Sequence, residues 1–343
     1  MKKRVTLSDV AREAKVSNAT VSLALRDSPQ IPQSTKRAIR ATAERIGYVY
    51  NQSAANLRSQ NQNLFGMVMS GSANRFNADL VSDLSRKCAE KGRLMLYGDA
   101  DESLATQRQI VTRMVENNVG GVFVCAAEGS SAEDFAMLTD YGIPVVQVLR
   151  KVQGMNASYI GFDNASAADI ITTRLIESGH RRIAFLGGSR EASSREERFT
   201  GYQKALRRAG IDADASLDIA TPVTRREGYK AMERLLALPE PPSAVFCYND
   251  ILAFGAMLHL TASGIQAGRD IAIAGFDDLP EAELWVPSLT SAYLDRNALV
   301  EEAFEQMLRA KETRYAANVV IEPRPVFRAS TQDWAGARQE GAG

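Results

Sequence analysis

The sequence predicts a small N-terminal all-α domain followed by a larger α/β body with parallel sheets in two lobes. Residues 6–46 contain three short amphipathic patterns with helix-capping signals, which predict three helices. From residue 62 onward, strand-sized apolar runs alternate with amphipathic stretches, a pattern typical of βαβ units. The body is too long to form one such sheet, and we therefore expect two lobes.

Length and composition exclude several classes of protein. The chain has 343 residues, of which 45% are hydrophobic and 24% charged, so disordered, collagen-like and coiled-coil proteins are excluded. The apolar runs are strand-sized and the N-terminal charges precede no apolar segment, so we expect neither a membrane partner nor secretion. Three cysteines (Cys88, Cys125 and Cys247) form no CxxC pair, which favours a reducing, cytoplasmic location.

The formal net charge of zero conceals an uneven distribution. Residues 1–60 hold 11 Lys and Arg against 4 Asp and Glu, a balance of +7, while the remainder holds 30 against 37. A basic domain on an acidic body indicates that the basic part contacts a polyanion such as DNA.

The three predicted helices have an ordered set of signals. The first begins with a capping box at Thr6 and Asp9, and its apolar residues share one face: Leu7, Val10, Ala11 and Ala14. Lys15-Val16 forms a turn, after which Ser17 caps a second helix with Val21, Ala24 and Leu25 inward. The third helix spans residues 33–46 and is expected to turn four residues inward: Ala38, Ile39, Thr42 and Ile46. Two short helices joined by a tight turn and braced by a third form a helix-turn-helix, although a plain three-helix domain or a protein-binding head remains an alternative.

Three segments of this head resemble the LacI/GalR family of bacterial transcription regulators: Val5–Ala11, Val16–Ser22 and Gly47–Asn51. The resemblance implies that Asn18, Ala19 and Leu23 face base edges in the major groove of double-stranded operator DNA. It also implies a set of phosphate contacts: Leu7, Ser17, Thr20, Ser22, Thr35, Tyr48 and Asn51. Two positions depart from the family pattern, since Lys15 stands where Gly is usual and Leu23 where many members have Arg.

Residues 51–61 separate the head from the body. The segment Gln52–Arg58 is too short to be a stable isolated helix, and a plain linker is one interpretation. The resemblance implies instead a hinge helix that folds on DNA, pairs with its twin and inserts Leu57 into the minor groove with Ala54 beside it.

The body contains eight apolar runs that predict buried strands: 64–70, 94–97, 121–125, 145–149, 159–162, 183–186, 244–248 and 271–276. Amphipathic stretches between them predict helices: 79–91, 167–178, 197–209 and 227–238. Ligands in open α/β sheets bind at the carboxyl ends of the strands, so two facing lobes are expected to hold one in a cleft.

The family resemblance extends through this body to about residue 330. It rests on five segments: 161–164, 179–184, 198–202, 249–256 and 275–278. It implies a type I periplasmic-binding-protein-like body, with residues 1–50 as the DNA-binding domain and residues 62–338 as the effector-binding and dimerisation domain. Lobe one is expected over 62–160 and 293–322, and lobe two over 161–292 and 323–338, with a tail at 339–343.

Five residues are candidates for binding the effector: Phe76, Ser194, Arg198, Asn249 and Asp277. A guanidinium can clamp vicinal hydroxyls or a carboxylate, and an amide and a carboxylate at strand ends suit sugar hydroxyls. Each has a structural alternative: a surface position for Arg198, helix capping for Asn249, a turn for Asp277 and core packing for Phe76.

No catalytic, metal or cofactor site is predicted. His180 and His259 lie in unlike contexts without ligand spacing, and the sequence contains no P-loop and no GxSxG motif. The chain is therefore expected to be a non-enzymatic transcription regulator, most plausibly a repressor controlled by a small polar, sugar-like metabolite. A solute-binding protein of the same body fold, or an activator or dual regulator, is the alternative. The resemblance implies a homodimer whose interface involves residues 79–91, including Cys88, and the region around Leu284-Trp285.

Overall fold

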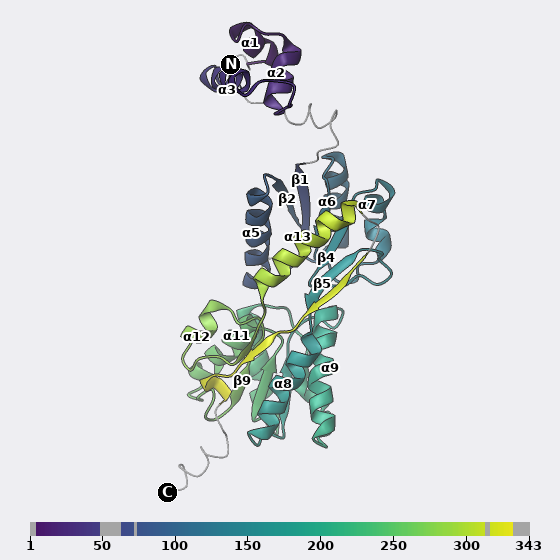
Figure 1. Ribbon diagram of the computed structural model, residues 1–343. Coiled ribbons are helices and arrows are strands. Elements are labelled where there is room, and N and C mark those ends of the chain that lie inside the picture. Colours follow the sequence, from purple (N-terminus) through teal and green to yellow (C-terminus); the bar gives the residue numbers. More distant parts are fainter. Residues whose placement is uncertain (1–4, 49–62, 72–73, 313–315, 332–343) are drawn as a thin grey trace. The chain divides into compact units, whose positions relative to one another are not determined.

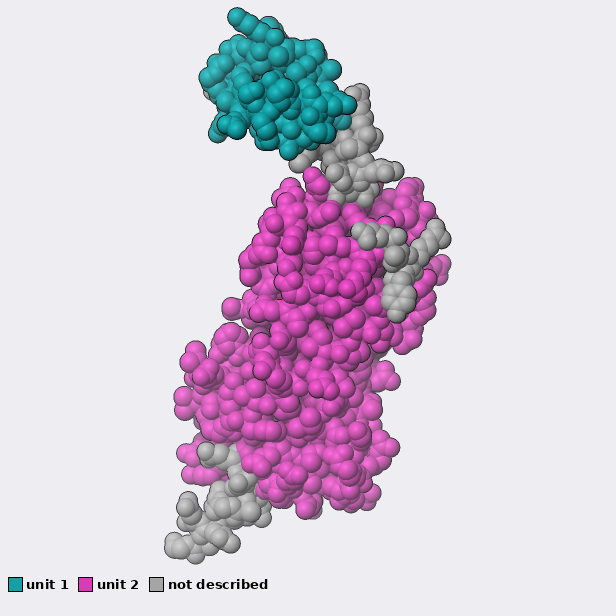
Figure 2. Space-filling model, viewed as in Figure 1, with its two compact units in different colours: residues 1–62 teal, residues 63–343 magenta. Residues whose placement is uncertain are grey.

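The computed structural model describes residues 5–48, 63–71, 74–312 and 316–331. The chain divides into two compact units, residues 1–62 and 63–343, which are described separately below (Figure 2). The hinge prediction, with Asn51, Ala54 and Leu57, and the predicted tail lie outside the described residues.

The head consists of three helices: α1 (Leu7–Glu13), α2 (Asn18–Leu25) and α3 (Gln33–Arg45). The capping box at Thr6 and Asp9 is present, and the side chain of Ser17 caps α2 by accepting the Thr20 amide hydrogen bond at 3.1 Å. A small apolar core joins the helices: Val10, Ala11, Val21, Ala24, Ile39 and Ala43.

One expected orientation in the head is wrong, because Ala38 is exposed and Ala43 is buried. Ile39 and Ala43 are four residues apart and share the inward face of α3, whereas Ala38 is rotated away from it. Lys36 is buried instead, and its Nζ donates to the carbonyl oxygen of Asp27 at 3.0 Å.

The turn between α1 and α2 places Lys15 in the left-handed region, with φ of 56°. This is the conformation for which Gly is favoured, so the departure from Gly places an ordinary residue in a less favourable backbone state.

The first sheet of the body has six parallel strands: β1 (Leu64–Met69), β2 (Leu94–Asp99), β3 (Val122–Val124), β4 (Val145–Val148), β5 (Ser158–Phe162) and β11 (Asn318–Ile321). Their order is β11-β5-β4-β3-β1-β2, and all five pairings are parallel.

Helices cover both faces of the first sheet. On β1, Phe65 and Met67 pack in one apolar cluster with residues of α5 (Arg75–Glu90) and α13 (Arg296–Glu312) (Figure 1). The next residue, Val68, packs in a second cluster with α6 (Leu104–Glu116). The 3-10 helix η1 (Ala132–Phe135) and α7 (Ala136–Asp140) also contribute to this second cluster. Because both faces are covered, the inner strands β1, β3, β4 and β5 are almost wholly buried, whereas the edge strands β2 and β11 are partly exposed.

The second sheet has four parallel strands in the order β7-β6-β8-β9. They are β6 (Ile183–Leu186), β7 (Asp218–Ile219), β8 (Ala244–Cys247) and β9 (Ala272–Ala274). The accompanying helical elements are α8 (Asn164–Glu177), α9 (Ser193–Arg208), η2 (Ala215–Leu217), α10 (Arg225–Leu236), α11 (Asp250–Ala262) and α12 (Pro280–Leu284).

The chain passes between the two sheets three times. It leaves the first sheet after β5, returns to it through α13, and leaves again after β11. The second and third crossover segments contain β10 (Ser291–Tyr293) and β12 (Arg324–Val326), which pair antiparallel. The short helix η3 (Ala329–Thr331) follows β12. The predicted fold class, a helix-turn-helix head with a two-lobed body of parallel sheets, is confirmed. Among the described residues, no helix is long and apolar enough to cross a membrane.

Candidate ligand cavity and nucleic-acid interface

A cavity of about 610 Å³ lies where the carboxyl ends of the two parallel sheets face each other. The segments that follow the strands of the first sheet supply polar lining, with Asn74 and the α5 residue Asn77 after β1, Glu102 after β2 and Arg150 after β4. The second sheet contributes from the opposite side: Ser189, Arg190, Thr221, Tyr248 and Asp277. The cavity has the position and size at which α/β proteins bind small molecules.

Arg198 contributes a largely buried guanidinium to this wall, and it is only 6% exposed. Its Nε donates to Asn164 Oδ1 at 3.1 Å, its Nη1 donates to the Tyr248 carbonyl at 2.6 Å, and its Nη2 lies 3.6 Å from Asp277 Oδ1. The guanidinium carbon also lies 3.7 Å from the centre of the Phe276 ring. These contacts hold a planar cation at the cavity surface.

Asp277 connects the two lobes. Its Oδ2 accepts a hydrogen bond from Asn74 Nδ2 at 3.1 Å, and Asn74 caps α5 in the other lobe through a bond from the Phe76 amide. Burial raises the pKa of Asp277, although Arg198 and the Asn74 amide act in the opposite direction. The backbone of Asp277 has φ of 104°, a strained conformation of the kind found at binding sites.

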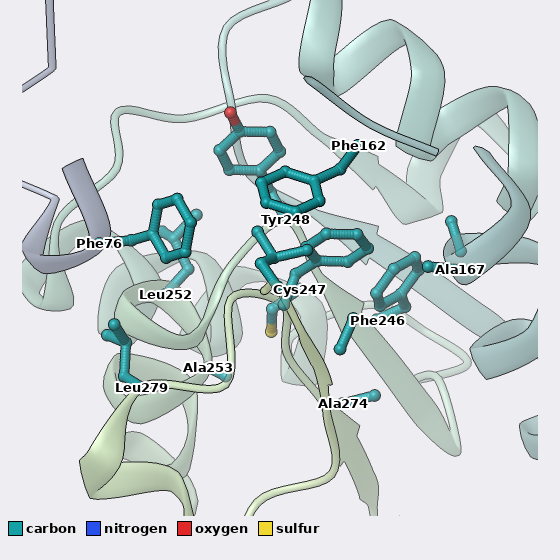
Figure 3. Close-up of a cluster of buried hydrophobic side chains, with 14 of the residues drawn as sticks. Phe76, Phe162, Ala167, Phe246, Cys247, Tyr248, Leu252, Ala253, Ala274 and Leu279 are labelled. Carbon is teal, nitrogen blue, oxygen red and sulfur yellow. The ribbon is translucent and has the colours of Figure 1, made fainter. Parts of the chain in front are cut away.

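An aromatic group forms part of the cavity boundary. Phe76 and Phe162 pack edge to face with ring centres 6.2 Å apart, and both belong with Tyr248 to the large buried cluster (Figure 3). The Tyr248 hydroxyl hydrogen bonds with Ser194 Oγ at 2.8 Å. Phe76 therefore packs in the core and also lines the cavity, so core packing does not exclude contact with a ligand.

Four of the five predicted ligand residues line this cavity: Phe76, Ser194, Arg198 and Asp277. Asn249 does not, since its side chain is 0% exposed and its Oδ1 caps α11 by accepting from the Leu252 amide at 3.2 Å. The structure thus shows Asn249 as a helix cap, and its amide also lowers the pKa of Asp277.

Several lining residues were not singled out from the sequence. Asn74 follows β1 in a loop without an apolar pattern, and Asn164 appears only as part of the segment 161–164. Glu102 and Arg150 form an ion pair in which Arg150 Nη1 lies 2.9 Å from each carboxylate oxygen. The sequence signal that could have indicated these lining residues is their position: each is a polar side chain that follows a predicted strand.

Short polar side chains surround the start of α2 on the head. Ser17, Asn18 and Ala19 are exposed, whereas Thr20, Ser22 and Leu23 are half-buried. Asn18 Nδ2 donates to Ser8 Oγ at 3.2 Å, which links the start of α2 to α1. Of the other predicted phosphate contacts, Leu7, Thr35 and Tyr48 are half-buried.

The head also exposes six cationic side chains: Arg12, Lys15, Arg26, Arg37, Arg40 and Arg45. The arrangement offers a helix N-terminus with short polar groups and surrounding positive charge, which suits a DNA groove and its phosphates. Among the described residues, no group of three His, Cys, Asp or Glu side chains could hold a metal ion.

A basic helix-turn-helix joined to a two-lobed, ligand-binding body defines the class of DNA-binding regulators. Comparison with family models agrees: residues 6–51 match the bacterial regulatory proteins of the lacI family, and residues 172–331 match the periplasmic binding protein-like domain. Head and body are thus each similar to the corresponding part of LacI-family transcriptional repressors, which join a DNA-binding domain to a ligand-binding domain.

Similar proteins cover nearly the whole chain. The transcriptional repressor PurR of Escherichia coli, and that of Shigella boydii, are 28% identical to it over 332 residues, covering 96% of this chain and 97% of theirs. A structure of the transcriptional regulator CelR in complex with cellobiose is 28% identical, with a TM-score of 0.71, and covers 95% of this chain and 100% of CelR. The operator-bound lac repressor dimer has a TM-score of 0.86 at 23% identity, covers 96% of this chain and 99% of its own, and supports the fold.

Proposed function

We propose that the protein represses transcription as a homodimer on a pseudo-palindromic operator, under control of a small polar effector in the cavity. The effector is a sugar or a related metabolite. The observation that carries this proposal is the cavity between the lobes, whose wall places Arg198 and Asp277 beside aromatic rings. Such a mixture of a few fixed polar groups and apolar faces is typical of small-molecule sites.

At the DNA, each head inserts α2 into a major groove. Asn18, Ala19 and Leu23 contact base edges, where an amide can pair with adenine and apolar groups can contact thymine methyls. The phosphate contacts come from Leu7, Ser17, Thr20, Ser22, Thr35, Tyr48 and Asn51. Paired hinge segments place Leu57, with Ala54 beside it, at the centre of the site.

The effector acts by changing the position of one lobe relative to the other. The protein acts in the cytoplasm, where its operators are accessible. Binding of effector and binding of DNA must then influence each other by the same factor. In the dimer, α5 and the region around Leu284 contact the partner copy.

The test is selection of purified protein on a randomised duplex pool at physiological salt, followed by sequencing. A two-fold symmetric enriched site supports the proposal. If no site is enriched, the selection is repeated with a mixture of metabolites, because a corepressor would then restore enrichment. No enrichment under either condition contradicts operator binding.

Two measurements on the selected site examine the details. Affinity for the operator is expected to fall about 10³-fold or more between 50 and 200 mM salt, because phosphates bound by the protein release counterions.

Leu57→Gly is expected to remove specific affinity for the operator while a ligand of the cavity still binds. Unchanged operator affinity would contradict the role of Leu57 in the minor groove.

A further inference from the structure

The charges that line the cavity are unequally neutralised, and this inequality limits which ligands can enter. Among the described residues, the cationic side chains of the lining are Arg150, Arg190 and Arg198. A ligand with a carboxylate or phosphate would need at least one of them to be available, because an unpaired buried charge is costly.

Each of these arginines already has an acidic partner of its own. Arg150 holds both oxygens of Glu102 at 2.9 Å and also donates to the Ala126 carbonyl at 2.9 Å. Arg198 has its three nitrogens directed at Asn164, Tyr248 and Asp277.

The third arginine, Arg190, lies at the exposed edge of the cavity and donates from Nη1 to Asp218 Oδ2 at 2.7 Å. Asp218 also pairs with Arg195, so two arginines share this one carboxylate at the edge of the second lobe. Any attraction of an anion to this corner is confined to the solvent-exposed rim, where charge interactions are weak.

Two acids of the lining have no cationic partner among the described residues. Asp101 and Glu128 both belong to loops of the first lobe, after β2 and β3 respectively. The backbone amide of Glu128 donates to Glu102 Oε2 at 2.9 Å, which places the Glu128 loop beside the Glu102–Arg150 pair. The first-lobe wall therefore carries two uncompensated negative charges next to one neutral ion pair.

The polar side chains of the lining also leave mainly hydrogen-bond acceptors free for a ligand. Both functional groups of Asn164 are occupied, since its Oδ1 accepts from Arg198 and its Nδ2 donates to Glu197 at 2.7 Å. Asn77 Nδ2 donates to the carbonyls of Ser70 and Gly71. What remains on the first-lobe side is mainly carboxylate oxygen, which accepts hydrogen bonds and donates none when ionised.

We infer that the cavity selects a polyhydroxylated ligand that is neutral or carries an amine, and rejects its anionic analogues, with Asp101 and Glu128 as the residues that set this selection. Hydroxyl and ammonium groups supply the donors that the carboxylates need. Phosphorylated sugars and sugar acids bring a further negative charge to the first-lobe wall, where the one lining cation, Arg150, is already paired with Glu102. This inference rests on the proposed function, because it concerns the same effector cavity.

The test compares matched ligands by calorimetry and thermal shift with the full-length protein. The panel consists of neutral mono- and disaccharides together with the amino sugar, the uronic acid and the sugar phosphate that correspond to each. For whichever neutral sugar binds, we expect its uronic acid and its phosphate to bind at least about tenfold more weakly. The amino sugar is expected to bind about two- to fivefold more tightly, since Asp101 is exposed and its attraction is screened.

A charge-removing variant assigns the selection to residues. In Asp101→Asn with Glu128→Gln, the ratio of amino-sugar to neutral-sugar affinity should fall to about one, and the penalty on the anionic analogues should shrink. Asp101 has φ of 46°, a conformation that Asn also adopts readily, so the loop is expected to persist.

The matched control is Glu133→Gln with Asp140→Asn. Both control residues are exposed acids of the same lobe outside the cavity lining, so the net charge changes equally while the affinity ratios stay as in the unmodified protein. Raising the salt concentration should reduce the amino-sugar preference of the unmodified protein, which gives a check without mutation.

The possible failures are distinct. If a uronic acid or sugar phosphate binds more tightly than its neutral parent, the charge inference is wrong while the effector cavity stands. If the control pair changes the ratios as much as the Asp101 and Glu128 pair, the assignment to these residues is wrong. If no member of any class binds, the proposed sugar-like effector is contradicted and the inference falls with it.

Discussion

Single side chains in the cavity wall are held by partners that the fold brings from distant parts of the sequence. Asn74 and Asp277, 203 positions apart, form one hydrogen bond across the lobes. Arg198 and Asp277 are both nearly buried, so each neutralises a charge that would otherwise be costly in this environment. The binding surface is therefore also part of the stabilising framework of the body.

Removing both members of this pair should cost less stability than the sum of the two single removals. Arg198→Met or Asp277→Asn alone is expected to lower the unfolding free energy of the body by about 3 kcal/mol, because one partner loses its counter-charge or donor. Thermal and urea unfolding of the four proteins measures the coupling, and additive losses would contradict a direct interaction.

Asp250 predicts a pH dependence of stability. Burial, and then the nearby Asp277, raise the pKa of Asp250 well above its usual value, and the side chain accepts bonds from Ser291 Oγ at 2.6 Å and the Leu279 amide at 2.7 Å. An acid whose pKa is higher in the folded state takes up a proton more readily there, so it stabilises the fold as pH falls and costs stability above its folded pKa.

The measurement is the melting temperature of the unmodified protein and of Asp250→Asn across pH 7 to 4. The unmodified protein should gain stability relative to the variant as pH falls through this window, because only it can take up the proton. A difference that is constant with pH, or that changes in the opposite direction, would show that Asp250 titrates normally.

At the scale of elements, strong apolar patterns were predictable and short polar ones were not. Each of the eight predicted apolar runs overlaps a strand of the structure, and the four predicted helices correspond to α5, α8, α9 and α10. The strands β7, β10, β11 and β12 were not predicted. Three of them have only two or three residues, and β11 is a partly exposed edge strand of four, so no strong apolar run marks them. Pairing with distant strands, rather than local preference, determines such elements.

The candidate site followed the same division. Residues at the ends of strong strands, such as Asp277, could be proposed from the sequence, since parallel strands place their carboxyl ends together. Asn74 could not, because its role depends on a contact with the opposite lobe. Asn249 shows the remaining ambiguity, since an amide after a strand and before a helix fits a cap as well as a ligand.

The start of α2 predicts separable effects on folding and on DNA binding. Ser17→Ala removes the cap of α2 and is expected to lower the stability of the head by about 1 kcal/mol. Ser17→Asp retains an oxygen for the cap but adds negative charge where a phosphate is proposed to lie.

Thermal unfolding and anisotropy on the selected operator distinguish the two variants. The Asp variant should keep the stability of the head and lose at least about tenfold in affinity. Equal affinity of the Asp variant and the unmodified protein would place Ser17 away from the phosphates.

At the scale of the whole molecule, the structure leaves apolar residues exposed in the region where a dimer interface was predicted. Leu284 is 79% exposed and Val286 is 88% exposed, while Trp285 between them packs on Phe254 with ring centres 4.5 Å apart. Cys88 was expected at this interface, but its side chain is fully buried in the core of its own chain, where burial raises its pKa to about 11. Cys88 therefore offers no surface to a partner copy, whereas Leu284 and Val286 offer exposed apolar side chains in the other predicted interface region.

Leu284→Glu is expected to weaken dimerisation by at least about tenfold, since it places a charge in an apolar contact. Tyr141→Glu is the control, because Tyr141 is also largely exposed but lies outside the predicted interface. Sedimentation equilibrium of both variants measures the effect. Equal dimerisation of Leu284→Glu and the control would place the interface elsewhere.

The bond between Asn74 and Asp277 also influences how sensitive the protein is to its effector. The Asn74 amide occupies an acceptor of Asp277 that the hydroxyl of an incoming ligand would otherwise use, so the chain would compete with such a ligand. The apparent dissociation constant then equals the intrinsic one divided by the fraction of molecules in which this bond is open. Substitutions that strengthen or weaken a single amide–carboxylate contact would therefore shift the metabolite concentration at which the gene responds, without altering either the operator or the contacts made by the bound ligand.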